Sequence, residues 1–133
     1  MQTHLTIPAN LAEISAFTPK LESQLQHLVV EVRTTVTLAV HELLVNIVEH
    51  GYMDEAGKID LTITHTSIDL SIVVTDQAKT AFEMPDQIDA PDPVDLPEGG
   101  MGMFIIHQAF DAVKYERLEQ GNRWTLVKTL GGA

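Results

Sequence analysis

The segment Val32–Gly51 constrains the fold more than any other part of the chain, and it reads VRTTVTLAVHELLVNIVEHG. The spacing of its apolar residues predicts a helix of about 19 residues, roughly 28 Å long at 1.5 Å per residue. We expect this helix to end at Gly51, because glycine readily takes the left-handed conformation that caps a helix C-terminus.

One stripe of this predicted helix is polar. At about 100° per residue, Asn46 and Glu49 lie within about 40° of Glu42, and His50 lies about 80° from it. The stripe is either a buried or half-buried polar site or the solvated edge of an amphipathic helix, and the helix alone favours neither. The opposite side is apolar and carries Val36, Val40, Leu43, Leu44 and Ile47.

Composition limits what the whole chain can be. With 133 residues, 44% of them hydrophobic, the chain is long enough to bury one core, so we expect a single domain over residues 1–133. There is no run of 18 apolar residues and no basic N-terminus followed by an apolar stretch, so we expect a cytoplasmic protein. The absence of cysteine excludes disulfides, thiolate metal sites and a catalytic thiol.

The net charge of −11 argues against nonspecific binding to nucleic acid or to an anionic membrane, because the phosphates would be repelled. Basic protein partners and metal-screened anions remain open. If the chain binds a nucleotide, it needs Mg²⁺ and backbone N–H groups, since the sequence has only eight lysines and arginines.

Periodicity and turn residues predict the other elements. Whether Asn10 and Pro19 begin one kinked helix or two helices stays open. The order β-α-α-β-β-loop-α-β-β predicts an α+β sandwich with a mixed, mainly antiparallel sheet and helices on one face. The expected elements are a strand at His4–Ile7, a hairpin over Ile59–Thr64 and Leu70–Thr75, an irregular acidic lid within Asp76–Gly102, a helix over Gly102–Phe110, and a second hairpin, Val113–Leu118 with Arg123–Leu130, turning over Glu119–Asn122.

Three clusters could carry chemistry. One turn apart, Glu42 and Asn46 reach one small volume, where asparagine can give a neutral oxygen to Mg²⁺ and glutamate can take a proton. Asp76 follows an apolar strand and can accept from an exocyclic amine, or it is an ordinary turn aspartate. The glycines of Glu98–Gly102 open a predicted helix whose free N–H groups can cradle a phosphate, or they form a flexible turn.

Several better-known motifs do not fit these residues. Position 45 is valine, where a zinc-protease helix that began at His41 would need a second histidine. The acids of Asp86–Asp95 lack the alternate spacing and central glycine of a calcium loop. The glycine cluster lacks the Gly-Lys-Ser/Thr of a Walker loop and the preceding strand of a dinucleotide fingerprint.

In this order, the clusters resemble the motifs of the GHKL, or Bergerat-fold, ATPases, most closely the compact anti-sigma factor serine/threonine kinases. Glu42–Gly51 resembles the N box of that family, Val73–Ala78 its first glycine box, and Glu98–Ile106 its second. Asp111–Lys128 is similar to the final hairpin of the family. The resemblance covers nearly the whole chain and implies a Bergerat fold.

The resemblance implies that ATP and Mg²⁺ are the cofactors. It implies that Asn46 holds Mg²⁺ on the triphosphate, that Glu42 acts as general base, and that Asp76 reads the adenine amino group. It also implies phosphorylation of a serine on an anti-anti-sigma (STAS-type) partner, binding of a sigma factor or similar regulator, and a homodimer. The implied nucleotide-binding loops contain Ala78, Gly99, Gly100, Met101 and Gly102, and the backbone of the three glycines would cradle phosphates.

Two departures from the family pattern keep a second function open. Ala78 stands where the family usually has glycine, so its φ must be negative. No lysine or arginine lies in Pro97–Gly102 to clamp the γ-phosphate, and Lys79 is the nearest candidate. The alternative is therefore an ATP-binding module that switches partners without catalysis. A histidine-kinase catalytic fragment also fits the motifs, although the chain shows no phosphoacceptor helix.

Overall fold

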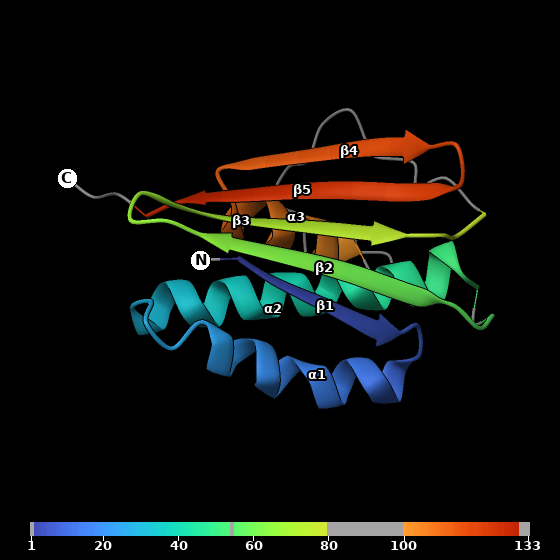
Figure 1. Cartoon of the computed structure of the whole chain (residues 1–133), viewed down its shortest axis with the longest axis horizontal. Coiled ribbons are helices and arrows are strands. Elements are labelled where there is room, and N and C mark those ends of the chain that lie inside the picture. Colours follow the sequence, from blue (N-terminus) through green and yellow to red (C-terminus); the bar gives the residue numbers. More distant parts are fainter. Residues whose placement is uncertain (1, 54, 80–99, 131–133) are drawn as a thin grey trace.

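The computed structural model describes residues 2–53, 55–79 and 100–130. Figure 1 shows its strands as one layer and its helices as a second layer behind them, which confirms the predicted α+β sandwich. In chain order the elements are β1 (Gln2–Pro8), α1 (Leu11–Gln24), α2 (Val30–Asn46), the π-helical turn η1 (Ile47–Gly51), β2 (Lys58–His65), β3 (Asp69–Asp76), α3 (Gly100–Ala109), β4 (Ala112–Leu118) and β5 (Gly121–Thr129).

The sheet has the strand order β1-β2-β3-β5-β4, and each of its four described pairings is antiparallel. The mixed sheet that the sequence suggested is therefore not found among the described strands. The reason lies in the connection after β3, in which the chain passes through α3 to the far edge as β4 and then returns as β5. Strands β3 and β4 run in the same direction, but β5 separates them.

Alternation along the strands turns one row of side chains toward the helices. Burying a large aliphatic side chain stabilises a fold by about 1.5–3 kcal/mol, so these rows hold the two layers together. The buried rows are Ile59, Leu61 and Ile63 of β2, Leu70, Ile72 and Val74 of β3, and Trp124 and Leu126 of β5, and they face Val36, Val40, Leu43 and Leu44 of α2 and Ile14, Phe17 and Leu21 of α1.

Among the described residues, no helix is long and apolar enough to cross a membrane.

The N-terminal helical region is one helix. Asn10 caps α1 by accepting a hydrogen bond from the backbone N–H of Glu13 at 2.8 Å. Pro19 lies inside α1, so the helix continues through the point at which a second start was possible. The hydroxyl of Thr18 lies 2.8 Å from Nδ1 of His41, and this hydrogen bond ties α1 to α2.

The end of α2 differs from the prediction. The helix widens into η1, in which the N–H of Tyr52 donates to the carbonyl of Ile47 at 2.8 Å, five residues back. The predicted left-handed cap at Gly51 is wrong, because the positive φ, 52°, occurs at Met53. Gly51 serves a different purpose. A Cβ there would lie only 3.3 Å from the Cβ of Ala78, so glycine lets the helix end approach the loop after β3.

The second hairpin is tighter than predicted, because β5 begins at Gly121 and the turn is confined to residues 119–120. Gly121 has a φ of +115°, and a Cβ at this position would lie 1.9 Å from the carbonyl oxygen of Asp76. This close approach keeps the first residues of β5 paired with the last residues of β3, so that Asn122 lies directly opposite Asp76.

Replacing Gly121 with alanine should therefore lower the free energy of unfolding by roughly 2 kcal/mol or more, since the added Cβ meets both an unfavourable φ and the Asp76 carbonyl. Urea denaturation measures the change. The control is Gln120→Ala in the adjoining exposed turn, which should stay within about 0.5 kcal/mol of the wild type. Equal stability of the two variants would contradict the packing described at Gly121.

Candidate functional site

The C-terminal ends of α2 and β3 meet at the same side of the molecule (Figure 1). Asn46 is the last residue of α2, and Asp76 is the last residue of β3. Two contacts join the segments that follow them. Gly51 lies against Ala78, and the hydroxyl of Tyr52 accepts a hydrogen bond from the N–H of Gln77 at 2.8 Å. The structure thus brings the predicted polar stripe and Asp76 to one end of the sandwich.

The polar stripe of α2 divides into two parts. Glu42 and Asn46 are half-buried, and neither has a hydrogen-bond or ion-pair partner among the described residues. Glu49 and His50 lie within the wider turn η1 and are exposed. These two polar groups, Glu42 and Asn46, one turn apart, are therefore unpaired within the part of the chain that the structure describes. The opposite side of the helix is buried as predicted, at Val36, Val40, Leu43, Leu44 and Ile47.

Asp76 is almost fully buried, with 2% of its surface exposed. Its Oδ1 accepts hydrogen bonds from the backbone N–H of Ala78 at 2.9 Å and from Nδ2 of Asn122 at 3.0 Å. Burial raises the pKa of this carboxyl above its ordinary value, while these hydrogen bonds and the charge of Arg117 act in the opposite direction. A buried carboxyl with several donors is the kind of group that recognises a ligand N–H.

Sequence reasoning missed three residues of the last hairpin that surround Asp76. The hydroxyl of Tyr115 donates to Oδ1 of Asn122. Arg117 donates through Nη1 to the carbonyl of Ala78 at 3.0 Å and to Oδ1 of Asn122 at 3.3 Å, and through Nη2 to the carbonyl of Lys79 at 2.9 Å. One signal was present in the sequence, because Asn122 continues the inward-facing row that contains Trp124.

Tyr52 anchors the loop after β3 from the other side. Its side chain is buried, and its hydroxyl donates to the carbonyl of Lys58 at 2.5 Å while accepting from Gln77. Burial raises the pKa of this phenol. Gly57 leaves room for the ring, since a Cβ there would come within 2.3 Å of Cε1 of Tyr52. Tyr52, with the room that Gly57 leaves for it, therefore fixes the position of Gln77.

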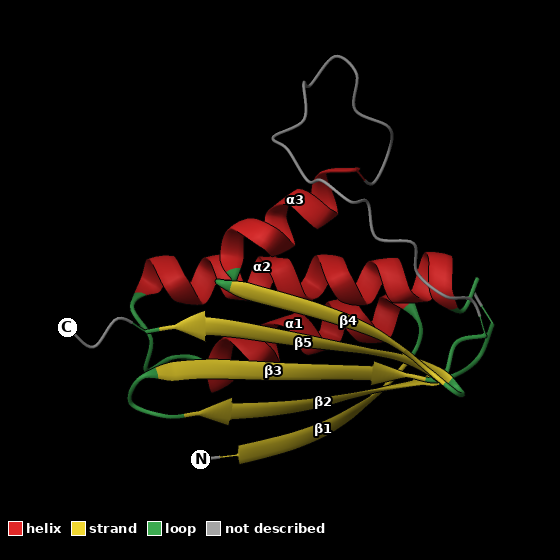
Figure 2. Cartoon of the chain, turned by 90° about the horizontal axis from the view of Figure 1, so that it is seen from above, coloured by secondary structure: helices red, strands yellow, loops and turns green. Residues whose placement is uncertain are grey.

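The glycine cluster is described in part. Gly100, Met101 and Gly102 form the first turn of α3, two residues earlier than the predicted helix, so backbone N–H groups of this turn lie at a helix N-terminus. Figure 2 shows α3 beside α2 and inclined to it. Glu98, Gly99 and the acidic lid Asp86–Asp95 lie outside the described residues.

Ala78 has the backbone conformation that the sequence required. The only non-glycine residue with a positive φ in the described part of the chain is Met53, so Ala78 is compatible with its position. Its side chain is buried against Gly51. Alanine in place of glycine therefore causes no backbone strain at this point.

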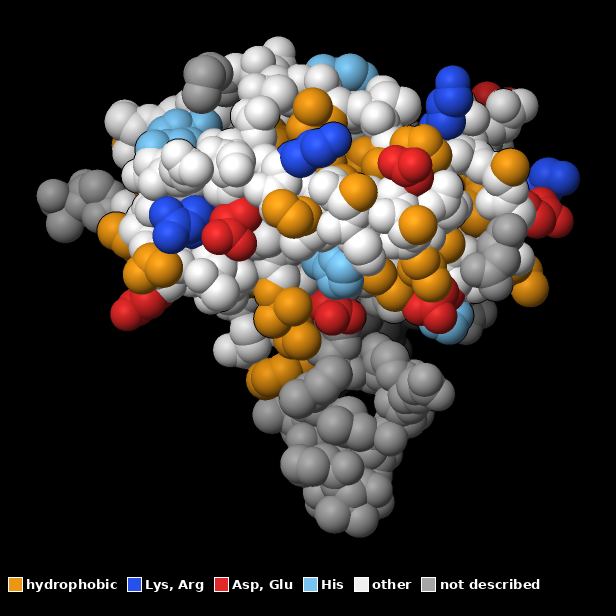
Figure 3. Space-filling view, turned by 90° about the horizontal axis from the view of Figure 1, so that it is seen from below, with side chains coloured by type: hydrophobic (Ala, Val, Ile, Leu, Met, Phe, Trp, Pro, Cys, Tyr) orange, Lys and Arg blue, Asp and Glu red, His pale blue; other side chains and the backbone are white. Residues whose placement is uncertain are grey.

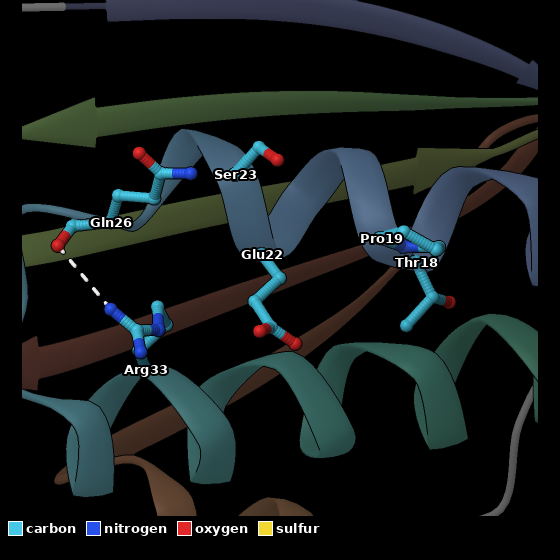
Figure 4. Close-up of a pocket in the computed structure, with 6 residues that line it drawn as sticks. All are labelled: Thr18, Pro19, Glu22, Ser23, Gln26 and Arg33. Carbon is cyan, nitrogen blue, oxygen red and sulfur yellow. Dashed lines mark hydrogen bonds between the residues drawn. The ribbon is translucent and has the colours of Figure 1, made fainter.

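A hollow of about 490 Å³ lies between α1 and α2 (Figure 4). Glu22 points from α1 toward α2, and Arg33 donates to the carbonyl of Gln26 at 3.4 Å. None of the predicted site residues lines this hollow, so it is separate from the junction at Asp76. The residues that line the hollow are Thr18, Pro19, Glu22, Ser23, Gln26 and Arg33.

Figure 3 shows no continuous basic patch among the coloured residues of the face seen from below.

Comparison with known proteins gives a consistent result. The model of a protein family described as the histidine kinase-like ATPase domain matches residues 7–128. A curated relative, the serine-protein kinase RsbW of Halalkalibacterium halodurans, is 38% identical over 85 residues, which cover 59% of this chain and 52% of the relative. The chain therefore spans about half the length of this relative.

Two solved structures share the fold. One contains the RsbU and RsbW domains of Rv1364c from Mycobacterium tuberculosis, with a TM-score of 0.71 and 17% identity over 98% of this chain and 32% of that chain. The other is the histidine kinase domain of the blue-light activated histidine kinase EL346 from Erythrobacter litoralis, with a TM-score of 0.57 and 19% identity over 88% of this chain and 61% of that chain. At these identities the structures support the fold alone.

The raised pKa of Asp76 predicts how its substitution changes stability with pH. Because the folded state disfavours the ionised carboxyl, the wild type loses stability as pH rises from the unfolded pKa to the folded pKa of Asp76. Asp76→Asn keeps an oxygen for the donors of Ala78 and Asn122 without the charge. We expect it to raise the free energy of unfolding at pH 7 by about 1 kcal/mol.

This gain should disappear as pH falls through the folded pKa of Asp76, where the wild-type carboxyl is also neutral. Urea denaturation of both proteins between pH 4 and about pH 8 measures the difference. A destabilised Asp76→Asn variant at every pH would contradict the account of this buried charge.

Proposed function

This chain belongs to the family of histidine kinase-like ATPase domains, and from that premise we propose that it is an ATP-dependent serine/threonine protein kinase of the anti-sigma type. The match over residues 7–128 carries the proposal, because it includes Glu42, Asn46, Asp76 and the first turn of α3 in one domain. The likeness to a relative named serine-protein kinase supports transfer to serine.

The adenine end of the nucleotide lies at Asp76 in this proposal. An ionised carboxylate accepts a hydrogen bond from the exocyclic amine of adenine. Ala78 lines the same end of the site, and its N–H holds Asp76 in place. Backbone groups of Gly99, Gly100, Met101 and Gly102 bind the phosphates at the N-terminus of α3, where free N–H groups and the helix dipole favour negative charge. Since the chain carries a net charge of −11, this backbone contribution is essential.

Mg²⁺ fits Asn46. The amide oxygen of Asn46 is a hard, neutral ligand, and the side chain is half-buried without a partner among the described residues. The described residues contain no cluster of three or more histidine or acidic side chains able to hold a metal ion. Such an environment suits Mg²⁺, which binds to one or two protein ligands and takes its other ligands from phosphate and water. When bound, it neutralises charge on the triphosphate.

Glu42 is the general base in this proposal. Its position one helical turn before Asn46 and its half-buried side chain support this role, in which it takes the proton from the hydroxyl of an acceptor serine. The serine oxygen forms a bond to the γ-phosphorus, the bond from that phosphorus to the leaving oxygen of ADP breaks, and the proton remains on Glu42. The reaction yields a phosphoserine and ADP.

The proposed acceptor is a serine on an anti-anti-sigma (STAS-type) protein, and the second partner is a sigma factor or similar regulator. The acidity of the chain favours a basic surface on at least one of these partners. In this proposal the kinase is a cytoplasmic homodimer that binds neither nucleic acid nor membrane.

A second candidate function is a nucleotide-responsive binding module without catalysis. One feature of the sequence favours it, namely the absence of lysine or arginine in Pro97–Gly102, whereas Ala78 fits its position without backbone strain. Incubation of the chain with labelled ATP and a candidate STAS-type partner distinguishes the two functions. Stoichiometric phosphoserine on the partner supports the kinase, whereas a nucleotide-dependent complex without phosphoserine supports the module.

Saturating Mg-ATP should stabilise the wild type by a few kcal/mol against thermal unfolding, because only the folded chain binds it. The Asn46→Ala variant should need about tenfold more Mg-ATP for the same shift, since it lacks the metal ligand. Differential scanning calorimetry with and without Mg-ATP gives both results. No shift of the wild type at millimolar Mg-ATP would remove the kinase and the module together.

Glu42→Gln should keep the Mg-ATP shift and reduce phosphoserine formation by at least about a hundredfold, because glutamine cannot accept the serine proton. Glu49→Gln, an exposed acid of the same helix region, is the matched control and should transfer phosphate at the wild-type rate. Retained transfer by Glu42→Gln would refute the general-base assignment.

A further inference from the structure

A chain of hydrogen bonds with a fixed direction leads from Arg117 to Asp76. A guanidinium group only donates, and Nη1 of Arg117 donates to Oδ1 of Asn122 at 3.3 Å. The hydroxyl of Tyr115 donates to the same oxygen. With its oxygen held by these donors, the amide of Asn122 turns Nδ2 toward Asp76 and donates to Oδ1 of that carboxyl at 3.0 Å. These donors favour the orientation of the amide in which Nδ2 faces Asp76.

The direction of this chain also fixes the role of Asp76. The carboxyl receives hydrogen bonds from Nδ2 of Asn122 and from the N–H of Ala78, so it acts as an acceptor toward the protein. These bonds and the charge of Arg117 lower the pKa of Asp76, against the larger effect of burial, which raises it. Without these groups, a carboxyl this deeply buried would hold its proton more tightly.

Arg117 acts on the same carboxyl by a second route. Its two terminal nitrogens donate to the carbonyls of Ala78 at 3.0 Å and Lys79 at 2.9 Å. These bonds fix the backbone just after β3, and the N–H of Ala78 in that backbone is the second donor to Asp76. One exposed side chain on an edge strand thus holds both the amide and the backbone N–H that donate to a buried carboxyl.

We propose that Arg117 and Asn122 are positioning residues that set nucleobase selectivity by holding Asp76 as an ionised acceptor. The site then accepts a purine with an amino group at C6 and rejects a 6-oxo purine. This inference rests on the proposed function, since it deepens the role given there to Asp76. Neither residue contacts the phosphates in this proposal, so their effect is confined to the base.

The preference for a 6-amino purine follows from the hydrogen bond that the C6 group can make with the Asp76 carboxylate. A 6-amino group donates to the carboxylate, whereas a 6-oxo group places an oxygen against it and leaves both groups without a donor. A site that is built to hydrogen-bond a particular ligand group strongly rejects analogues that lack this group. ATP and inosine triphosphate are suitable probes, because they differ at C6 of the base, and the wild type should prefer ATP by at least about a hundredfold.

The test is calorimetric titration of the full chain with the Mg²⁺ complexes of ATP and inosine triphosphate between pH 6 and pH 8. Arg117→Met should bind ATP about tenfold more weakly, and its ATP preference should fall several-fold. Its ATP affinity should also decrease more steeply than that of the wild type as pH falls, because Asp76 takes up a proton more readily. Arg117→Lys keeps the charge and should recover much of the wild-type pH profile.

Arg123→Met is the matched control. It removes the same charge from the neighbouring strand, but Arg123 pairs with Glu116 at 3.3 Å and alternates with the inward-facing Asn122 and Trp124, so it lies on the other face of the sheet. Its ATP affinity, ATP preference and pH profile should match those of the wild type. Since Arg117 is exposed, its variants are expected to fold and decide the outcome even if Asn122→Ala unfolds.

A nucleotide-free measurement separates this proposal from the proposed function. The NMR titration of the labelled Asp76 carboxyl should move to higher pH in Arg117→Met and Asn122→Ala, but not in Arg123→Met. If the titration moves while no protein binds ATP, the proposed function fails and the positioning network stands. If ATP binds but Arg117→Met keeps the wild-type affinity, ATP preference and Asp76 titration, the proposal is overturned.

Discussion

The buried carboxyl of Asp76 and the amide of Asn122, paired across β3 and β5, form the interaction on which this end of the molecule depends. The alternation that buries Val74 and Trp124 also turns these two polar side chains inward. A charge in that position is costly unless donors surround it. The donors come from Ala78 and Asn122, with Arg117 behind them, and Gly121 lets the two strands approach closely enough for the pairing.

Most of the fold follows from local patterns in the sequence. The alternation of Ile59–Thr64 and Leu70–Thr75 and the opposed faces of α2 are encoded by residues close together in the chain, and the structure confirms them. Asp76 and the polar stripe of α2 were likewise visible as local clusters. The end of α2 was not visible in this way, because the π turn at Ile47–Gly51 lies against Ala78, which is distant in sequence.

The groups that hold Asp76 in place were missed for the same physical reason. Arg117 lies on an edge strand and is exposed, so the sequence presents it as an ordinary surface charge. Its importance comes from bonds to Ala78, Lys79 and Asn122, which form only when β4 and β5 reach the end of β3. The sequence also did not reveal that β3 and β4 run in the same direction without pairing, since β5 lies between the two strands. Pairing across the sheet decides both features.

The two solved structures retain this architecture at 17% and 19% identity, so the layers tolerate wide changes in sequence. A shared fold does not assign function, and the candidate site lies where α2 and β3 end. The most direct test is the effect of Mg-ATP on the NMR signals of the Ala78 backbone N–H and the Asn122 side-chain amide. Both signals should shift saturably, while Thr18 and Gln26 beside the α1–α2 hollow stay unchanged. Saturable ATP binding that shifts signals at that hollow and leaves Ala78 and Asn122 unchanged would contradict a nucleotide site at Asp76.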